Sequence, residues 1–75
     1  MNLSEAEIGK TYFVEKVELP EDKKRRILDL GLTKGTKIKV INLKNKGPMI
    51  ISARGTYFAL GRKYALGIMV LEMEL

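Results

Sequence analysis

The chain has 75 residues, a formal net charge of +5 and 45% hydrophobic residues, and it contains no cysteine, histidine or tryptophan. Without thiols and imidazoles it can form no disulfide and no Ser-His-Asp triad, and it lacks the common ligands of zinc, copper and iron. At this length we expect a single domain over residues 1–75. We further expect no enzymatic activity, no catalytic residue, no metal site and no cofactor.

The sequence also bears on location and on binding partners. No apolar run approaches the ~20 residues that a membrane-spanning helix needs, and the acidic first eight residues do not resemble a signal peptide. We therefore expect a cytoplasmic protein. The positive net charge is compatible with nucleic-acid binding. A lysine-rich soluble surface is the favoured interpretation, so nucleic acid is not the expected partner.

The first residues predict a short entry segment over residues 3–9, in which Leu3 and Ile8 anchor the chain to the core. Ser4 and Glu7 have the spacing of a capping box, which predicts one helical turn. We expect this segment to lead directly into the first strand.

Two elements follow, a strand over residues 11–19 and a helix over residues 21–30. β-forming side chains predict the strand, and their imperfect alternation predicts a bulge near Glu15 and Lys16. In the helix, acidic residues come first and basic residues follow, as the helix dipole favours. Gly31 stands where a left-handed helix cap is expected.

Four further strands are predicted, over residues 36–43, 49–54, 57–60 and 68–74. Composition assigns residues 44–48 to a loop. Gly55–Thr56 resembles a two-residue hairpin turn with glycine first, the type II′ pattern. Residues 62–66 predict a single helical turn closed by Gly67.

These elements predict a mainly β fold: a small SH3-like β-barrel of about five strands, with one inserted helix and a short C-terminal helical turn. Closing the sheet into a barrel would protect its edges, which a small β protein must do in some way. The expected core draws on apolar residues from every element: Val14, Val17, Ile27, Leu30, Leu32, Ile38, Val40, Met49, Ile51, Phe58, Leu60, Ala65, Ile68 and Val70.

Four segments occur in the order and spacing of a known family. Residues 26–32 have its helix-to-corner motif, and residues 34–40 have its turn followed by a strand. Residues 47–55 have its central hairpin, and residues 58–70 have its closing segment. On these motifs together the chain resembles the FeoA family, whose members are small cytosolic components of bacterial ferrous iron transport.

The resemblance implies an SH3-like FeoA domain with a non-enzymatic accessory or regulatory role in ferrous iron transport. This role would be exerted by contact with FeoB, a membrane transporter with a cytosolic GTP-binding domain, and the membrane would be reached only through that partner. The family carries a transition-metal-binding label. Glu72 and Glu74 share a strand face and could hold a hard cation, but because cysteine and histidine are absent we expect no iron site. Two alternatives stay open: a basic nucleic-acid-binding module and a metal-responsive regulatory domain.

The last strand is the main candidate for partner binding. If Ile68 and Val70 point inward, then Met69, Leu71 and Met73 point outward and form an apolar ridge. Such a ridge suggests a partner surface, and methionine adapts well to such surfaces. The same ridge would allow weak self-association. The alternative is a small second core beneath the N-terminal segment.

Basic residues supply the remaining candidates. The helix carries four consecutive cations, of which Arg25 and Arg26 are candidate partner contacts, although a solvated helix face is the simpler interpretation. Tyr57 completes the candidate partner site. A nucleic-acid-binding face would combine two tyrosines with basic residues, and the alternative is ordinary polar alternation on an outer sheet face. That candidate face consists of Lys37, Lys39, Arg54, Arg62, Lys63, Tyr57 and Tyr64.

Overall fold

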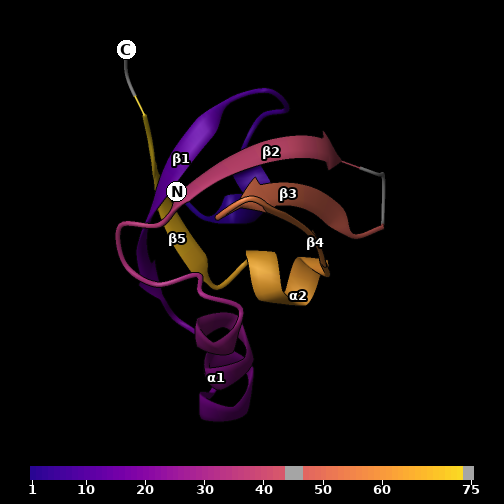
Figure 1. Cartoon of the computed structure of the whole chain (residues 1–75). Helices are drawn as coiled ribbons and strands as arrows, with labels where there is room; N and C mark the ends of the chain where they lie inside the picture. Colours follow the sequence, from indigo (N-terminus) through magenta and orange to yellow (C-terminus); the bar gives the residue numbers. More distant parts are fainter. Residues whose placement is uncertain (44–46, 74–75) are drawn as a thin grey trace.

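The computed structural model describes residues 1–43 and 47–73. Its elements are η1 (Leu3–Glu5), β1 (Thr11–Val17), α1 (Glu21–Asp29), β2 (Lys37–Leu43), β3 (Met49–Ala53), β4 (Thr56–Leu60), α2 (Arg62–Ala65) and β5 (Ile68–Glu72). The strands form one antiparallel sheet in the order β4-β3-β2-β1-β5, which curls around the core (Figure 1). The predicted mainly β, SH3-like architecture is confirmed. Within the described residues, no pairing of β4 with β5 closes the sheet into a complete barrel.

The bulge predicted in the first strand is present. The pairing of β1 with β5 shifts register between Val14 and Lys16, so Glu15 is the additional residue. The extra residue changes which positions face inward. Tyr12 and Val14 are buried before it, and Val17 packs against the core after it. The failed alternation in the sequence is therefore the mark of this bulge.

Helix α1 ends where its glycine predicts. Gly31 has a φ of 88°, its N–H donates to the carbonyl of Leu28 at 2.9 Å, and the N–H of Leu32 donates to the carbonyl of Ile27 at 3.2 Å. These two bonds form a Schellman motif, which requires a left-handed residue at the position of Gly31. The chain therefore turns sharply, and Leu32 is completely buried behind the helix end.

The hairpin between β3 and β4 corrects the predicted turn. Ala53 pairs with Thr56, so the central turn residues are Arg54 and Gly55 rather than Gly55 and Thr56. Both have a positive φ, 54° for Arg54 and 79° for Gly55. Two such residues define a type I′ turn, with glycine second, whereas type II′ has glycine first. The strand after the turn begins one residue earlier than predicted.

The N-terminal cap also differs from its prediction. The side chain of Asn2 accepts from the backbone of Ser4, and Glu5 Oε1 accepts from the N–H of Asn2 at 2.9 Å, so the capping box belongs to Asn2 and Glu5. Met1 and the cap residue Asn2 pair with the outer edge of β5: the N–H of Val70 donates to the carbonyl of Met1 at 2.9 Å, and Asn2 forms a bridge with Met69. This contact covers part of one sheet edge. Strand β4, the other edge, pairs only with β3 among the described residues.

Most of the predicted core is confirmed, and five positions differ in an informative way. Leu30 is 40% exposed and Ile8 is 56% exposed, because the chain reverses next to each of them. Tyr12 was not expected in the core but is buried, with its hydroxyl accepting a hydrogen bond from the N–H of Glu7 at 2.9 Å. Val17 and Phe58 are only partly buried against the core. Buried residues from the strands, the helical segments and two connecting segments form one cluster: Leu3, Ala6, Tyr12, Val14, Ile27, Leu32, Ile38, Val40, Met49, Ile51, Ala53, Leu60, Ala65, Ile68 and Val70.

Candidate functional site

The alternation predicted for the last strand is present in β5. Ile68 and Val70 are completely buried, whereas Leu71 is 56% exposed. Met69 and Met73 are half-buried on the same outer side. The predicted ridge therefore exists as an arrangement of side chains, with Leu71 as its most exposed member.

The ridge continues onto the neighbouring strand. Leu71 is the cross-strand partner of Phe13 on β1, and the N–H of Met73 donates to the carbonyl of Thr11 at 2.9 Å. Phe13 in turn lies opposite Lys37 of β2. Directly paired residues share one face of a sheet. We define the β5–β1 strip as Phe13, Met69, Leu71 and Met73, an apolar surface with a lysine on its β2 side.

Charged side chains pair at one end of this strip. Lys10 Nζ lies 2.5 Å from Glu7 Oε2 and 3.6 Å from Glu72 Oε1. The hydrogen bond to Glu7, followed by the charges of Glu7 and Glu72, raises the pKa of Lys10 above 10.5. All three side chains are largely exposed. These ion pairs are therefore screened by salt and define the border of the strip rather than hold it together.

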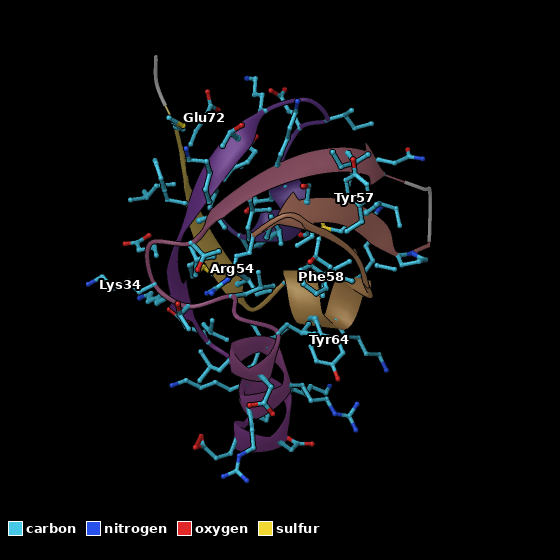
Figure 2. The ribbon with its side chains drawn as sticks, in the orientation of Figure 1. Lys34, Arg54, Tyr57, Phe58, Tyr64 and Glu72 are labelled. Atoms are coloured by element: carbon cyan, nitrogen blue, oxygen red, sulfur yellow. The ribbon has the colours of Figure 1, made fainter. Side chains whose placement is uncertain are left out.

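Tyr57 lies at the opposite edge of the sheet. It is 73% exposed and belongs to a row across the outer face in which Lys39 pairs with Ser52 and Ser52 pairs with Tyr57. Figure 2 shows Tyr57 and Glu72 at different ends of the curved sheet. Tyr57 is therefore not part of the β5–β1 strip, although the sequence grouped it with the same partner site.

The two arginines of the candidate site lie on α1, away from the strip. Arg25 is exposed. Arg26 Nη1 donates to the hydroxyl of Tyr64 on α2 at 3.2 Å, and Lys23 Nζ lies 6.0 Å from the centre of the same ring. Tyr64 therefore belongs to the contact between the two helices. The proposed basic and aromatic face is not assembled on one surface, because Lys39 and Tyr57 share the sheet while Tyr64 faces α1.

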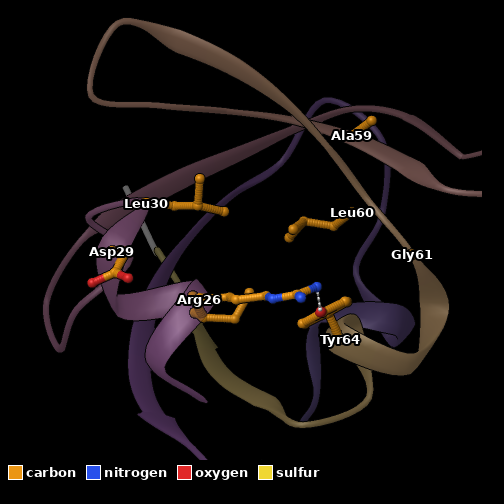
Figure 3. A pocket seen from close by; sticks show the side chains of 8 residues that line it. Arg26, Asp29, Leu30, Ala59, Leu60, Gly61 and Tyr64 are labelled. Carbon is orange, nitrogen blue, oxygen red and sulfur yellow. Dashed lines mark hydrogen bonds between the residues drawn. The ribbon is translucent and has the colours of Figure 1, made fainter. Parts of the chain in front are cut away.

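The helices and strand β4 border a groove of about 350 Å³ that the sequence did not predict (Figure 3). Leu30, just after the end of α1, and Leu60 from β4 stand on its two walls, and the Arg26–Tyr64 hydrogen bond crosses beneath them. The groove is lined by Arg26, Ile27, Asp29, Leu30, Ala59, Leu60, Gly61 and Tyr64. The only feature of the sequence that points to this groove is Leu30. This apolar residue stands at the helix end, and the Schellman turn leaves its side chain 40% exposed.

Potential metal ligands do not cluster in the part of the chain that the structure describes. Among residues 1–43 and 47–73 there is no group of three or more histidine, cysteine, aspartate or glutamate side chains that could hold a metal ion. Glu74, which with Glu72 forms the carboxylate pair considered from the sequence as a cation site, lies outside the described residues. In the same part of the chain, no helix has the length and apolar character needed to cross a membrane.

Comparison with known proteins places this arrangement in a class and then in a family. A zinc-bound FeoA from Stenotrophomonas maltophilia, described as an SH3 domain protein, superposes with a TM-score of 0.82 at 28% identity, over 93% of this chain and 88% of that one. The fold is therefore that of the small SH3-like proteins. The FeoA domain model matches residues 1–72, and the chain belongs to the FeoA family.

Two further relatives support this assignment. A crystal structure of an iron uptake regulatory protein, FeoA, has a TM-score of 0.90 and 32% identity, and the alignment covers 97% of both chains. A protein of Methanocaldococcus jannaschii, provisionally named Fe(2+) transport protein A, is 38% identical over 72 residues, which is 96% of this chain and 87% of the relative. The family resemblance derived from the sequence motifs is confirmed.

Proposed function

We propose that this chain is a non-enzymatic accessory protein of ferrous iron transport that acts by contact with the cytosolic part of a FeoB-type membrane GTPase transporter. Family membership and the names of the relatives support the transport role. The described residues hold no metal-ligating group of three, which favours action through a partner over direct handling of the ion. The protein would work in the cytoplasm and reach the membrane only through the transporter.

The observation that carries the contact is the exposure of Leu71 within the β5–β1 strip. An apolar side chain that is 56% exposed between two half-buried methionines is available for burial against another protein. Burying a leucine completely stabilises by about 1.5–3 kcal/mol, and Leu71 has about half of that still to gain. Lys37 beside the strip would favour an acidic border on the partner.

Co-purification and transporter activity together test this function. The chain, mixed with a detergent-solubilised FeoB-type transporter, is expected to co-elute on size exclusion, and its addition is expected to change GTP hydrolysis or ferrous ion uptake in proteoliposomes. An unrelated small basic SH3-like domain serves as the control for charge. Absence of both co-elution and any change in transporter activity would contradict the proposal.

The same preparation addresses the two alternatives. A nucleic-acid-binding module would shift an RNA or DNA oligonucleotide at low salt and release it steeply as salt rises. A metal-responsive domain would show site-specific NMR shifts on titration with ferrous or manganous ion. We expect neither response. A salt-dependent shift that saturates at one site, or localised metal-induced shifts, would replace the transport proposal with the corresponding alternative.

A further inference from the structure

We propose that the groove between α1, β4 and α2 binds an extended acidic peptide segment of a partner protein, which adds as a strand to the free edge of β4. This binding site is separate from the β5–β1 strip and does not depend on it. Three features of the groove carry the proposal: an available strand edge, an apolar slot and an arginine that has no carboxylate within ion-pair distance among the described residues.

The strand edge follows from the hairpin register. A two-residue turn joins its flanking residues, here Ala53 and Thr56, as a hydrogen-bonded pair. Bonded and non-bonded pairs alternate along an antiparallel ladder. Phe58 and Leu60 therefore bond to β3, whereas Tyr57 and Ala59 direct their N–H and C=O groups away from it. Ala59 lines the groove, so its backbone groups are placed to pair with an added strand.

The slot follows from the two leucines. Leu30 is 40% exposed and Leu60 is 4% exposed, and they face each other across the groove (Figure 3). A peptide that extends the sheet would direct every second side chain toward this side. An aliphatic side chain at that position would enter between the leucines and remove the exposed part of Leu30 from water.

The charge of the groove selects the peptide. Arg26 makes a hydrogen bond with the hydroxyl of Tyr64 and, among the described residues, has no carboxylate within ion-pair distance. Lys23 adds a second cation over the same ring. Asp29, the one acidic residue among the described residues that line the groove, lies at the α1 side, away from Tyr64 (Figure 3). The next inward position of the peptide lies about 6.6 Å along the strand, where a carboxylate would replace the phenol as the partner of Arg26.

The matching probe is a short synthetic peptide with this pattern, acetyl-Ser-Thr-Leu-Thr-Glu-Thr-Ser-amide, titrated into the full chain and followed by amide NMR shifts. Saturable shifts are expected at Ala59, Leu60 and Arg26. Replacing the peptide glutamate by lysine should weaken binding by roughly tenfold or more, the usual range for loss of a charge-assisted hydrogen bond. N-methylation of the leucine and glutamate amides and N-methylation of the threonine amides should change the binding affinity by very different factors. Only one of these two sets of amides faces β4.

Variants of the chain separate the groove from general attraction. Arg26→Gln should weaken peptide binding roughly tenfold, whereas Lys34→Gln removes the same charge from an exposed loop on another side of the molecule (Figure 2) and should leave binding unchanged. Any of four results would overturn the proposal. These are equal losses of peptide affinity in both variants, equal effects of the two N-methylation patterns, displacement of the peptide by a thymidine oligonucleotide, and no saturable binding. If the peptide experiments fail in this way while the chain still contacts the transporter through the β5–β1 strip, the proposed function stands.

Discussion

Leu19 closes directly over the backbone of Gly67. Its Cγ lies 2.6 Å from the position that a Cβ on residue 67 would occupy, and the carbonyl oxygen of Glu18 lies 2.7 Å from the same position. The N–H of Glu18 also donates to the carbonyl of Gly67 at 2.6 Å. The segment between β1 and α1 is thereby held against the start of β5, and only glycine leaves room for this approach.

Gly67→Ala is therefore expected to destabilise the fold by about 1–3 kcal/mol, the usual range for overpacking. Gly61→Ala is the matched control, because a Cβ there meets nothing within 4 Å and neither glycine has a positive φ. Urea unfolding of both variants measures the difference. Equal stability of the two variants would show that Leu19 moves aside without cost.

Arg54→Asn is expected to stabilise the protein. Arg54 holds a φ of 54° in the type I′ turn, a conformation that costs most side chains about 1–2 kcal/mol and that asparagine adopts more readily. We expect a gain of roughly 0.5–1 kcal/mol in the free energy of unfolding. The arginine side chain packs near Gly31, with its Cδ 3.1 Å from the position of a Cβ there. A net loss of stability would show that this packing outweighs the turn conformation.

Tyr12→Phe should cost about 1 kcal/mol, because the N–H of Glu7 loses its hydrogen-bond acceptor beside the core. Amide exchange at Glu7 should accelerate at the same time. Tyr57→Phe removes a hydroxyl from a residue that is 73% exposed and should leave stability unchanged. If both variants unfold at the same denaturant concentration, the buried hydroxyl contributes nothing measurable.

The ion pairs predict one pH effect. The hydrogen bond that Lys10 donates to the carboxylate of Glu7 raises the pKa of Lys10 above 10.5, and the hydrogen bond that Lys16 donates to Glu18 raises the pKa of Lys16 in the same way. A lysine whose pKa is raised by folding adds stability at pH values below its pKa in the unfolded state. This stability is lost as the pH rises through its pKa in the folded state. Glu7→Gln should lower the pKa of Lys10 in an NMR titration and leave that of Lys16 unchanged. A shift of both lysines, or of neither, would contradict the assigned pairs.

Local chemistry made much of the fold predictable. The failed alternation at Glu15 marked a real bulge, and Gly31 marked the helix end, because each feature depends on a few neighbouring residues. The hairpin turn was predicted one residue too late, since a single glycine suits either the first position of a type II′ turn or the second of a type I′ turn. The pairing of Ala53 with Thr56 across the hairpin shows that the turn is of type I′.

The candidate site was predictable only in part. Alternation along one strand was enough to expose Leu71, but Phe13 joined the strip through a cross-strand pairing that no local pattern encodes. The groove brings Arg26 next to Tyr64, 38 residues apart. Such a surface depends on how α1 and α2 pack beside β4, which the sequence pattern does not specify. Tyr57, grouped with β5 in the sequence, lies at the other sheet edge for the same reason.

Leu71→Asp tests the partner contact most directly, in an equilibrium titration against a solubilised FeoB-type transporter. A charge on an exposed face changes stability by about 0.5 kcal/mol or less, whereas a desolvated charge at a contact weakens binding strongly. Leu66→Asp is the control, because Leu66 is 54% exposed but lies outside the strip. We predict that Leu71→Asp melts like the unchanged protein and binds at least roughly tenfold more weakly, while Leu66→Asp binds normally. Normal binding by a folded Leu71→Asp variant would contradict this account.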